Sequence, residues 1–161
     1  MLCHLDDRNY NKIQPLAELF GEFNLAKTRV MVEVEYLLAL IDSRVLSVKI
    51  DKSETIFLRT LYQKFDLKEF KKIKLIEKKT NHDIKAIEYY LKKKIVQKRI
   101  KGISTYVHIF LTSEDINNLA FGLLILQAKN NILLPRLELI ESHLIKLAQK
   151  SADYPMLART H

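Results

Sequence analysis

The sequence predicts an all-α fold, on the strength of three observations. Only three of the 161 residues are glycine and three are proline, which is too few for a turn-rich β fold. Hydrophobic residues make up 48% of the chain, which excludes a disordered protein. Long stretches place these residues three and four positions apart, the period of helices that each bury one face.

The first predicted helices lie between residues 15 and 64. Pro15 opens a short apolar turn, which Gly21 can close in a left-handed conformation. Asn24 is the expected N-cap of a long helix over 25–42, and a shorter helix covers 54–64. The apolar positions are Val30, Val34, Leu37, Leu38 and Ile41 in the long helix, and Ile56, Leu58 and Leu61 in the short one.

Two further helices flank a polar corner. Asp66 and Glu69 have the spacing of a capping box at the start of the first. Thr80 and Asn81 interrupt the pattern, and a new helix begins near Asp83. Their apolar positions are Leu67, Phe70, Ile73 and Ile76, and then Ile84, Ile87, Leu91 and Ile95, with lysines on the opposite side.

The last part of the chain is predicted to be one very long helix behind a connector. Residues 101–111 form the connector, extended where β-favouring residues gather at 106–110. Thr112 and Asp115 make a second capping-box candidate, and the helical pattern runs from Ser113 to about residue 149, with a kink or brief interruption at Pro135. So much leucine and isoleucine needs covering helices, from the rest of a polypeptide or from other subunits. We therefore predict an N-terminal helical domain at 1–111 and the start of a central helical-bundle domain at 112–161.

Several classes of protein are excluded or disfavoured. Cys3 is the only cysteine, so no internal disulfide can form and a cytoplasmic protein is expected. The first seven residues do not form a secretory signal, and no apolar run reaches membrane-spanning length. The five histidines lack metal-ligand spacing, so no structural metal is predicted.

The net charge of +8 is concentrated in one segment. Fourteen lysines and arginines lie between residues 64 and 101, against five acidic residues. A solvated helix face, attraction of anions including nucleic acid, and steering of a small polyanionic substrate are all consistent with this excess. Charge alone does not separate the three interpretations.

Three polar groups are candidates for chemistry. Asn81, His82 and Asp83 place an amide, an imidazole and a carboxylate beside the free N–H groups of a helix start, which suits an anion. Thr112 and Ser113 add two hydroxyls at another helix start. Taken alone, each of these two groups is better explained by simple helix capping. His108, among apolar and aromatic neighbours, has the alternative of being a hydrogen-bonded core histidine.

Taken together and in order, three segments are distinctive. They are Thr80-Asn81-His82-Asp83-Ile84-Lys85-Ala86, then Thr112-Ser113-Glu114-Asp115-Ile116-Asn117-Asn118, and finally Pro155-Met156-Leu157-Ala158-Arg159-Thr160-His161. Residues 25–38 also fit, with Arg29, Val32-Glu33-Val34 and Tyr36 in place. This ordered set resembles the adenylosuccinate lyases, a family of the fumarase/aspartase superfamily.

The resemblance implies a cytoplasmic, all-helical homotetramer without a cofactor, whose active sites are shared between subunits. It implies elimination of fumarate from adenylosuccinate, giving AMP, and from the succinocarboxamide ribotide of purine biosynthesis. Membrane and nucleic acid are not among the implied partners. By the resemblance, His161 is the general acid that protonates the departing nitrogen. The implied substrate-binding residues are Arg8, Asn81, His82, Asp83, His108, Thr112 and Ser113.

The chain departs from the family pattern in ways that limit this expectation. Family members are far longer, and the serine-bearing loop that supplies the general base would lie beyond His161. The family's Asp-Gly-Arg-Tyr appears as Asp6-Asp7-Arg8-Asn9-Tyr10, so the tyrosine is displaced by one position. We therefore expect a truncated chain that is inactive alone. The alternatives are a basic helical nucleic-acid-binding module, or a sister lyase acting on argininosuccinate, aspartate or fumarate.

Overall fold

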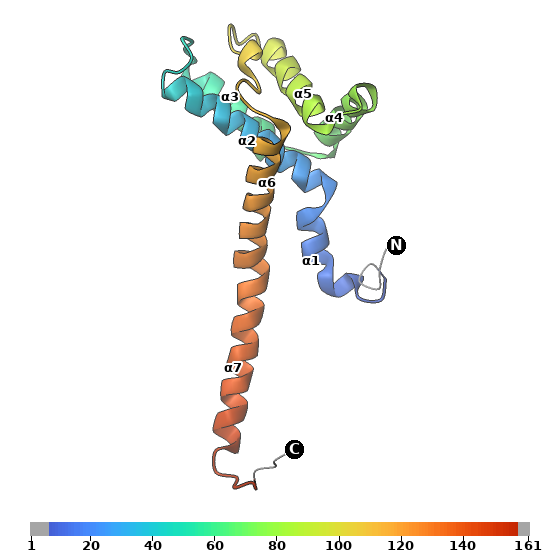
Figure 1. The fold of residues 1–161 in the computed structure, drawn as a ribbon, viewed down its shortest axis with the longest axis vertical. Coiled ribbons are helices and arrows are strands. Elements are labelled where there is room, and N and C mark those ends of the chain that lie inside the picture. The colour runs from blue at the N-terminus through green and yellow to red at the C-terminus, as the bar shows by residue number, and fades with distance from the viewer. Residues whose placement is uncertain (1–6, 158–161) are drawn as a thin grey trace. The chain divides into compact units, whose positions relative to one another are not determined.

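The computed structural model describes residues 7–157, and every regular element among them is helical (Figure 1). The all-α prediction is confirmed. The chain divides into two compact units, Met1–Ile125 and Leu126–His161, and each is described by itself. The domain boundary predicted after residue 111 stays a prediction.

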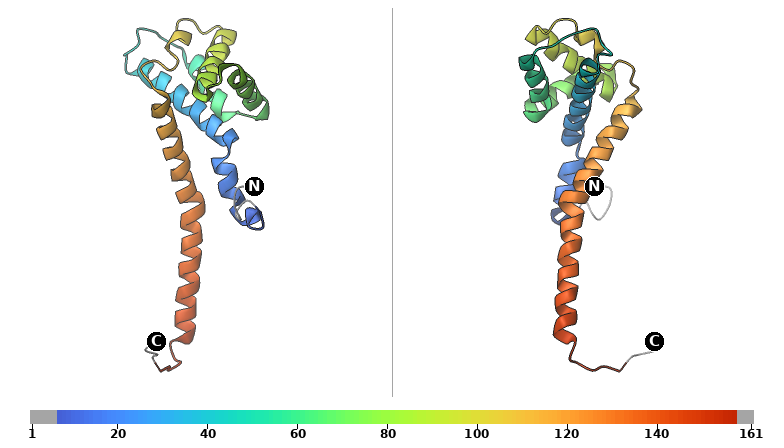
Figure 2. Two further views of the ribbon diagram at one scale, coloured as in Figure 1. Left: turned by 45° about the vertical axis from the view of Figure 1, so that its right-hand side comes forward. Right: turned by 90° about the vertical axis from the view of Figure 1, so that its left-hand side faces the viewer.

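The first unit is built on the long helix α2. Along the chain come α1 (Tyr10–Phe20), α2 (Glu22–Asp42), α3 (Lys52–Gln63), α4 (Leu67–Thr80) and α5 (Asp83–Lys98). A 3₁₀ turn, η1 (Ser104–Tyr106), then leads to α6 (Ser113–Ala128), which begins in this unit. Helices α4 and α5 form a hairpin that packs against α2 (Figure 2).

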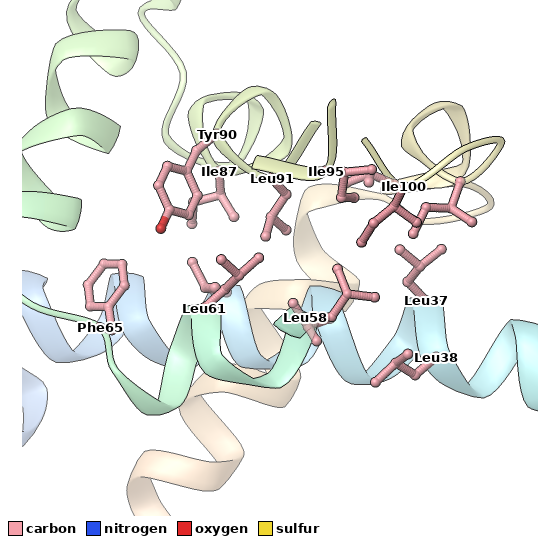
Figure 3. Packing of buried hydrophobic residues seen from close by; sticks show 14 of the residues in the cluster. Leu37, Leu38, Leu58, Leu61, Phe65, Ile87, Tyr90, Leu91, Ile95 and Ile100 are labelled. Carbon is pink, nitrogen blue, oxygen red and sulfur yellow. The ribbon is translucent and has the colours of Figure 1, made fainter. Parts of the chain in front are cut away.

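The hydrophobic core lies where α5 packs on to α2 and α3 (Figure 3). Leu58 of α3 is fully buried at its centre, and the four apolar positions predicted for α5 are all buried. A cluster of this kind stabilises the unit mainly through apolar area removed from water. The labelled side chains are Leu37, Leu38, Leu58, Leu61, Phe65, Ile87, Tyr90, Leu91, Ile95 and Ile100.

The prediction made from the sequence was wrong at the junction between α1 and α2. Pro15 lies inside α1 instead of opening it, and Gly21 has a φ of −65°, so it does not adopt the left-handed conformation. Gly21 is itself the N-cap of α2, whose first residue is Glu22. Asn24 therefore lies in the first turn, where its side-chain amide donates to the carbonyl of Leu19 at 2.9 Å.

Capping in the hairpin region also differs from the prediction. Asp66 accepts from the backbone N–H of Glu69 at 2.9 Å, which is half of a capping box. The reciprocal bond, from the backbone N–H of Asp66 to the Glu69 side chain, is missing because the Glu69 carboxylate pairs with cationic side chains instead. A complete box forms instead at Asp51 and Glu54, at the start of α3. Two predicted core residues, Ile56 and Leu67, are exposed.

The connector 101–111 is made of turns rather than extended chain. Gly102, His108 and Phe110 all have φ between 62° and 77°, the left-handed region. Ile103 and Val107 are buried and anchor the connector to the core. The β-favouring residues are therefore used for burial, while the turns determine the path of the chain.

The second unit contains a π-helical turn, η2 (Lys129–Leu133), and α7 (Leu134–Ser151). The backbone N–H of Leu134 bonds to the carbonyl of Lys129, five residues earlier. Pro135 follows and lacks an N–H, so the interruption predicted there takes the form of this turn. Within residues 7–157, no helix combines the length and apolarity needed to cross a membrane.

Glu69 connects the two helices of the α4–α5 hairpin. Its carboxylate pairs with Lys72 at 2.8 Å and with Lys94 of α5 at 2.7 Å, and accepts from the Tyr90 hydroxyl at 2.8 Å. Partial burial raises the pKa of Glu69, but the three donors outweigh it and bring that pKa to about 2. The hairpin is thus stabilised by an ionised carboxylate.

Replacing this carboxylate should make stability less dependent on pH. The folded-state pKa of about 2 lies below the unfolded value of about 4.3, so Glu69 stabilises above about pH 5 and loses that effect as pH falls toward 2. Glu69→Gln should lower the thermal midpoint more at pH 7 than at pH 3, where part of the ion-pair stabilisation has been lost, as measured by circular dichroism. Glu138→Gln on α7 is the exposed control. An equal decrease at both pH values would contradict the ion-pair explanation.

Leu58 provides a test of the core. Leu58→Ala removes a fully buried side chain and should cost about 2–5 kcal/mol of unfolding free energy, because a cavity remains. Ile56→Ala, on the same helix, removes an exposed side chain and should change stability by only about 0.5 kcal/mol. Urea unfolding measures both, and equal losses would show that the packing around α3 is wrongly described.

Candidate active site

The corner between α4 and α5 is formed by Asn81 and His82. Asn81 ends α4 in the left-handed conformation, with φ 52°, and its N–H bonds to the carbonyl of Glu77 at 2.8 Å. His82 is the N-cap of α5, where its Nδ1 accepts from the backbone N–H of Lys85 at 3.3 Å. Both side chains are exposed. The His82 imidazole therefore caps α5, and the Asn81 amide is exposed to solvent.

Asp83 is held by Arg29 of α2. The Arg29 side chain is only 11% exposed, and its Nη1 lies 2.9 Å from Asp83 Oδ2. The same guanidinium donates from Nε and Nη2 to Asn117 Oδ1 of α6, at 3.0 and 2.7 Å. Burial raises the pKa of Asp83, but the N–H of Ile84 and the charge of Arg29 lower it overall, so this carboxylate is ionised.

Thr112 and Ser113 lie at the start of α6. The backbone N–H and the hydroxyl of Thr112 both donate to Asp115 Oδ2, at 2.7 and 2.8 Å. This is the returning half of the predicted capping box, and it lowers the pKa of Asp115. The Thr112 hydroxyl is therefore already used as a donor, whereas half-buried Ser113 is the first residue of the helix.

His108 contacts a carboxylate of α2. Its Nδ1 lies 2.5 Å from Glu33 Oε1, and its side chain is 17% exposed, against 0% for that of Glu33. Burial raises the pKa of Glu33, and the hydrogen bond and charge of His108 oppose that shift. The contacts of His108 are thus those of a hydrogen-bonded histidine at the edge of the core, which was the alternative interpretation. Its side chain is also partly exposed.

Helix α2 brings most of the predicted residues together. Arg29 links the Asn81–Asp83 corner to α6 just after Thr112 and Ser113, and Glu33, one turn further along α2, holds His108. Arg8 lies exposed before α1, and within residues 7–157 no hydrogen bond or ion pair joins it to this group. His161 lies outside the described residues.

An open hollow of about 600 Å³ adjoins the corner. Its lining combines cationic, acidic and amide groups, which are Lys74, Glu77, Lys78, Asn81, His82 and Asp83. A separate hollow of about 500 Å³ lies between α4 and α5, where its lining includes Lys72, Lys79, Lys93 and Lys94 and none of the predicted site residues. Of these two hollows, only the first is lined by predicted site residues.

Sequence reasoning did not identify Arg29, Glu33 and Asn117 as parts of the site. The sequence did contain a signal that Glu33 has a special role. It lies three and four positions from Val30 and Leu37, two apolar residues that are both buried. A charged residue on the apolar face of a helix calls for a partner. Within residues 7–157, no group of three or more His, Cys, Asp or Glu side chains is placed to hold a metal ion.

Known proteins resemble this chain in sequence. The chain is similar to the adenylosuccinate lyases of Buchnera aphidicola subsp. Acyrthosiphon pisum (strain APS), Legionella pneumophila (strain Corby) and Escherichia coli (strain K12), with 43%, 40% and 35% identity over 160 residues. These alignments cover 98% of this chain but only 35% of each relative, so the chain spans about a third of their length.

A family model described as Lyase matches residues 10–161, which include the α2 contacts, the α4–α5 corner and the start of α6. The match extends over nearly the whole sequence. The chain belongs to this lyase family.

Proposed function

We propose that the chain forms the front third of an adenylosuccinate lyase. In the proposed reaction a base removes the proton beside a substrate carboxylate, the C–N bond breaks, and fumarate leaves as the new C=C bond forms. The departing nitrogen takes a proton from His161. The substrates are adenylosuccinate, giving AMP, and the succinocarboxamide ribotide of purine biosynthesis. The base belongs to a serine-bearing loop beyond residue 161, so the 161-residue chain alone is expected to be inactive.

The contact of Arg29 with both Asp83 and Asn117 carries this proposal. It ties two of the three motifs of the lyase resemblance to the guanidinium of one side chain that is only 11% exposed, although these motifs lie far apart in sequence. Simple capping of two independent helices needs no such link. The names of the similar proteins from Buchnera, Legionella and Escherichia supply the substrate class.

The geometry supports different roles for the proposed binding residues. The exposed Asn81 amide and His82 ring can donate to a carboxylate or phosphate beside the 600 Å³ hollow. Ionised Asp83 repels such anions, so we assign it to holding Arg29 and to accepting from a substrate hydroxyl. Ser113, Thr112 and His108 complete the binding set from the side of α6, and Arg8 is proposed as a phosphate contact.

Nucleic-acid binding receives little support from the basic segment. Five lysines in it pair with carboxylates of the same hairpin, at 2.6 to 2.9 Å, so part of the positive charge is neutralised internally. The paired lysines are Lys72, Lys74, Lys85, Lys92 and Lys94. What remains suits steering of a small, multiply charged substrate.

Homotetramer formation in the complete enzyme is also proposed. Leu137, Ile140, Leu144 and Leu147 follow one another at three- and four-residue intervals on α7, and each is 55–61% exposed. A stripe of this kind is typical of a helix in a bundle whose partners come from elsewhere. The proposed compartment is the cytoplasm, in keeping with Cys3 as the only cysteine.

A chimera tests the proposed function. Residues 1–161 are joined to the remaining part of the Buchnera relative, and fumarate release from adenylosuccinate is followed. We expect turnover in the parent chimera, and a loss of about 10²–10⁴-fold in kcat in His161→Gln with substrate binding retained, since a positioned proton donor is removed.

The matched control is His143→Gln, an exposed histidine on α7 whose Nδ1 lies 2.8 Å from the Leu139 carbonyl oxygen. It should leave kcat unchanged. A folded parent chimera without turnover, beside an active Buchnera protein, would reject the lyase proposal. Normal turnover in His161→Gln would reject only the assignment of the acid.

The apolar stripe predicts self-association of the 161-residue chain. Sedimentation equilibrium should show oligomers, and the double variant Ile140→Gln with Leu144→Gln should shift them toward monomer because both side chains are exposed apolar groups. Glu138→Gln with Lys146→Gln, on the same helix, preserves net charge and should not. A parent chain that remains monomeric at high concentration would contradict the proposed assembly surface.

A further inference from the structure

Glu33 is a carboxylic acid in a position that would suit leucine. It lies in the middle of α2, its side chain is 0% exposed, and its neighbours one turn away, Val30 and Leu37, are buried. Its Oε1 meets His108, while Oε2 is buried and has no hydrogen-bond partner among the residues that the structure describes. Burying an incompletely bonded carboxyl group destabilises a fold. Stability therefore does not account for this residue.

His108 adopts an unfavourable backbone conformation to reach Glu33. Its φ is 66°, and that of Phe110 is 62°, both in the left-handed region that side chains other than glycine seldom occupy. Such strain persists where the surroundings determine it, and it gathers at functional sites. Val107, buried beside His108, anchors the turn. The turn thus brings Nδ1 of the ring to Glu33 of α2 and leaves the His108 side chain 17% exposed.

We propose that Glu33 is a positioning residue, which holds the His108 ring by Nδ1 and so presents Nε2 to the substrate. This inference rests on the proposed function, in which His108 binds substrate. An imidazole with its proton on Nδ1 has a defined orientation and a defined second nitrogen, whereas a free ring can flip and change tautomer. The bond from Glu33 removes that ambiguity before substrate arrives.

Other charged groups around the pair are already engaged. Glu88 of α5 is buried and pairs with Lys85 at 2.8 Å and Lys92 at 2.6 Å. Asp115 of α6 accepts from Thr112, and on α2 the Arg29 guanidinium pairs with Asp83. None of these groups bonds to His108 in the described part of the chain. Glu33 is thus the side chain that fixes the ring.

Two substitutions separate the orienting effect of Glu33 on the His108 ring from the volume that the Glu33 side chain fills. Glu33→Leu fills the same space without an acceptor and should lower kcat/KM of the chimera by about 10²-fold, because the ring is no longer held. Glu33→Gln keeps an oxygen that can accept from Nδ1–H, and it should recover most of that loss. Glu88→Gln, at the other buried glutamate, is the control and should retain the parent value.

A double-mutant cycle distinguishes positioning from a general structural role. In a His108→Gln background, Glu33→Leu should cause no further loss, since its effect passes through the ring. Equal losses with and without His108 would overturn the proposal, and so would an unchanged kcat/KM in Glu33→Leu. A structural role would lower activity in both backgrounds.

A spectroscopic measurement on the 161-residue chain does not depend on activity. ¹⁵N ring signals should show His108 protonated at Nδ1, and Glu33→Leu should abolish that preference while circular dichroism stays unchanged. An identical tautomer in both chains would overturn the inference even if the chimera were active. An inactive parent chimera would instead reject the proposed lyase function, and the ring signals would still decide the role of Glu33.

Discussion

The site depends on the Arg29 guanidinium. From one turn of α2 it reaches Asp83 at the start of α5 and Asn117 in α6, so three helices are fixed to one another by a single planar cation. Arginine suits this role because its donors leave the group in set directions, so that Nη1 serves Asp83 while Nε and Nη2 serve Asn117. Lysine would offer one point charge and could not hold both partners with the same geometry.

Glu33 places a second polar contact on α2, one turn after Arg29. Two side chains four residues apart lie on the same face of a helix. On α2 both are largely removed from water, at 11% and 0% exposure, and both hold residues from distant parts of the chain. The helix therefore contributes to the core along most of its length and organises the candidate site along one short polar strip.

How far the sequence predicted this arrangement depends on the kind of interaction. The four apolar positions of α5, all buried, followed from their spacing. The corner at Asn81–Asp83 followed from the interruption of the pattern. The start of α2 was predicted wrongly, because Asn24 bonds backward to Leu19 while Gly21 takes the cap. The Arg29 contacts join residues as many as 88 positions apart, and no local pattern encodes such a pairing.

The left-handed backbone of Asn81, with φ 52°, has an evolutionary consequence. Only glycine, and to a lesser degree asparagine and aspartate, adopts this conformation with little strain. Folding alone would be satisfied equally well by glycine here. In a lineage released from selection for the proposed lyase activity, drift toward glycine would preserve the bend and discard the amide. The identity of this one residue across descendants therefore reports whether the proposed contact of the Asn81 amide, and not merely the bend, has been maintained.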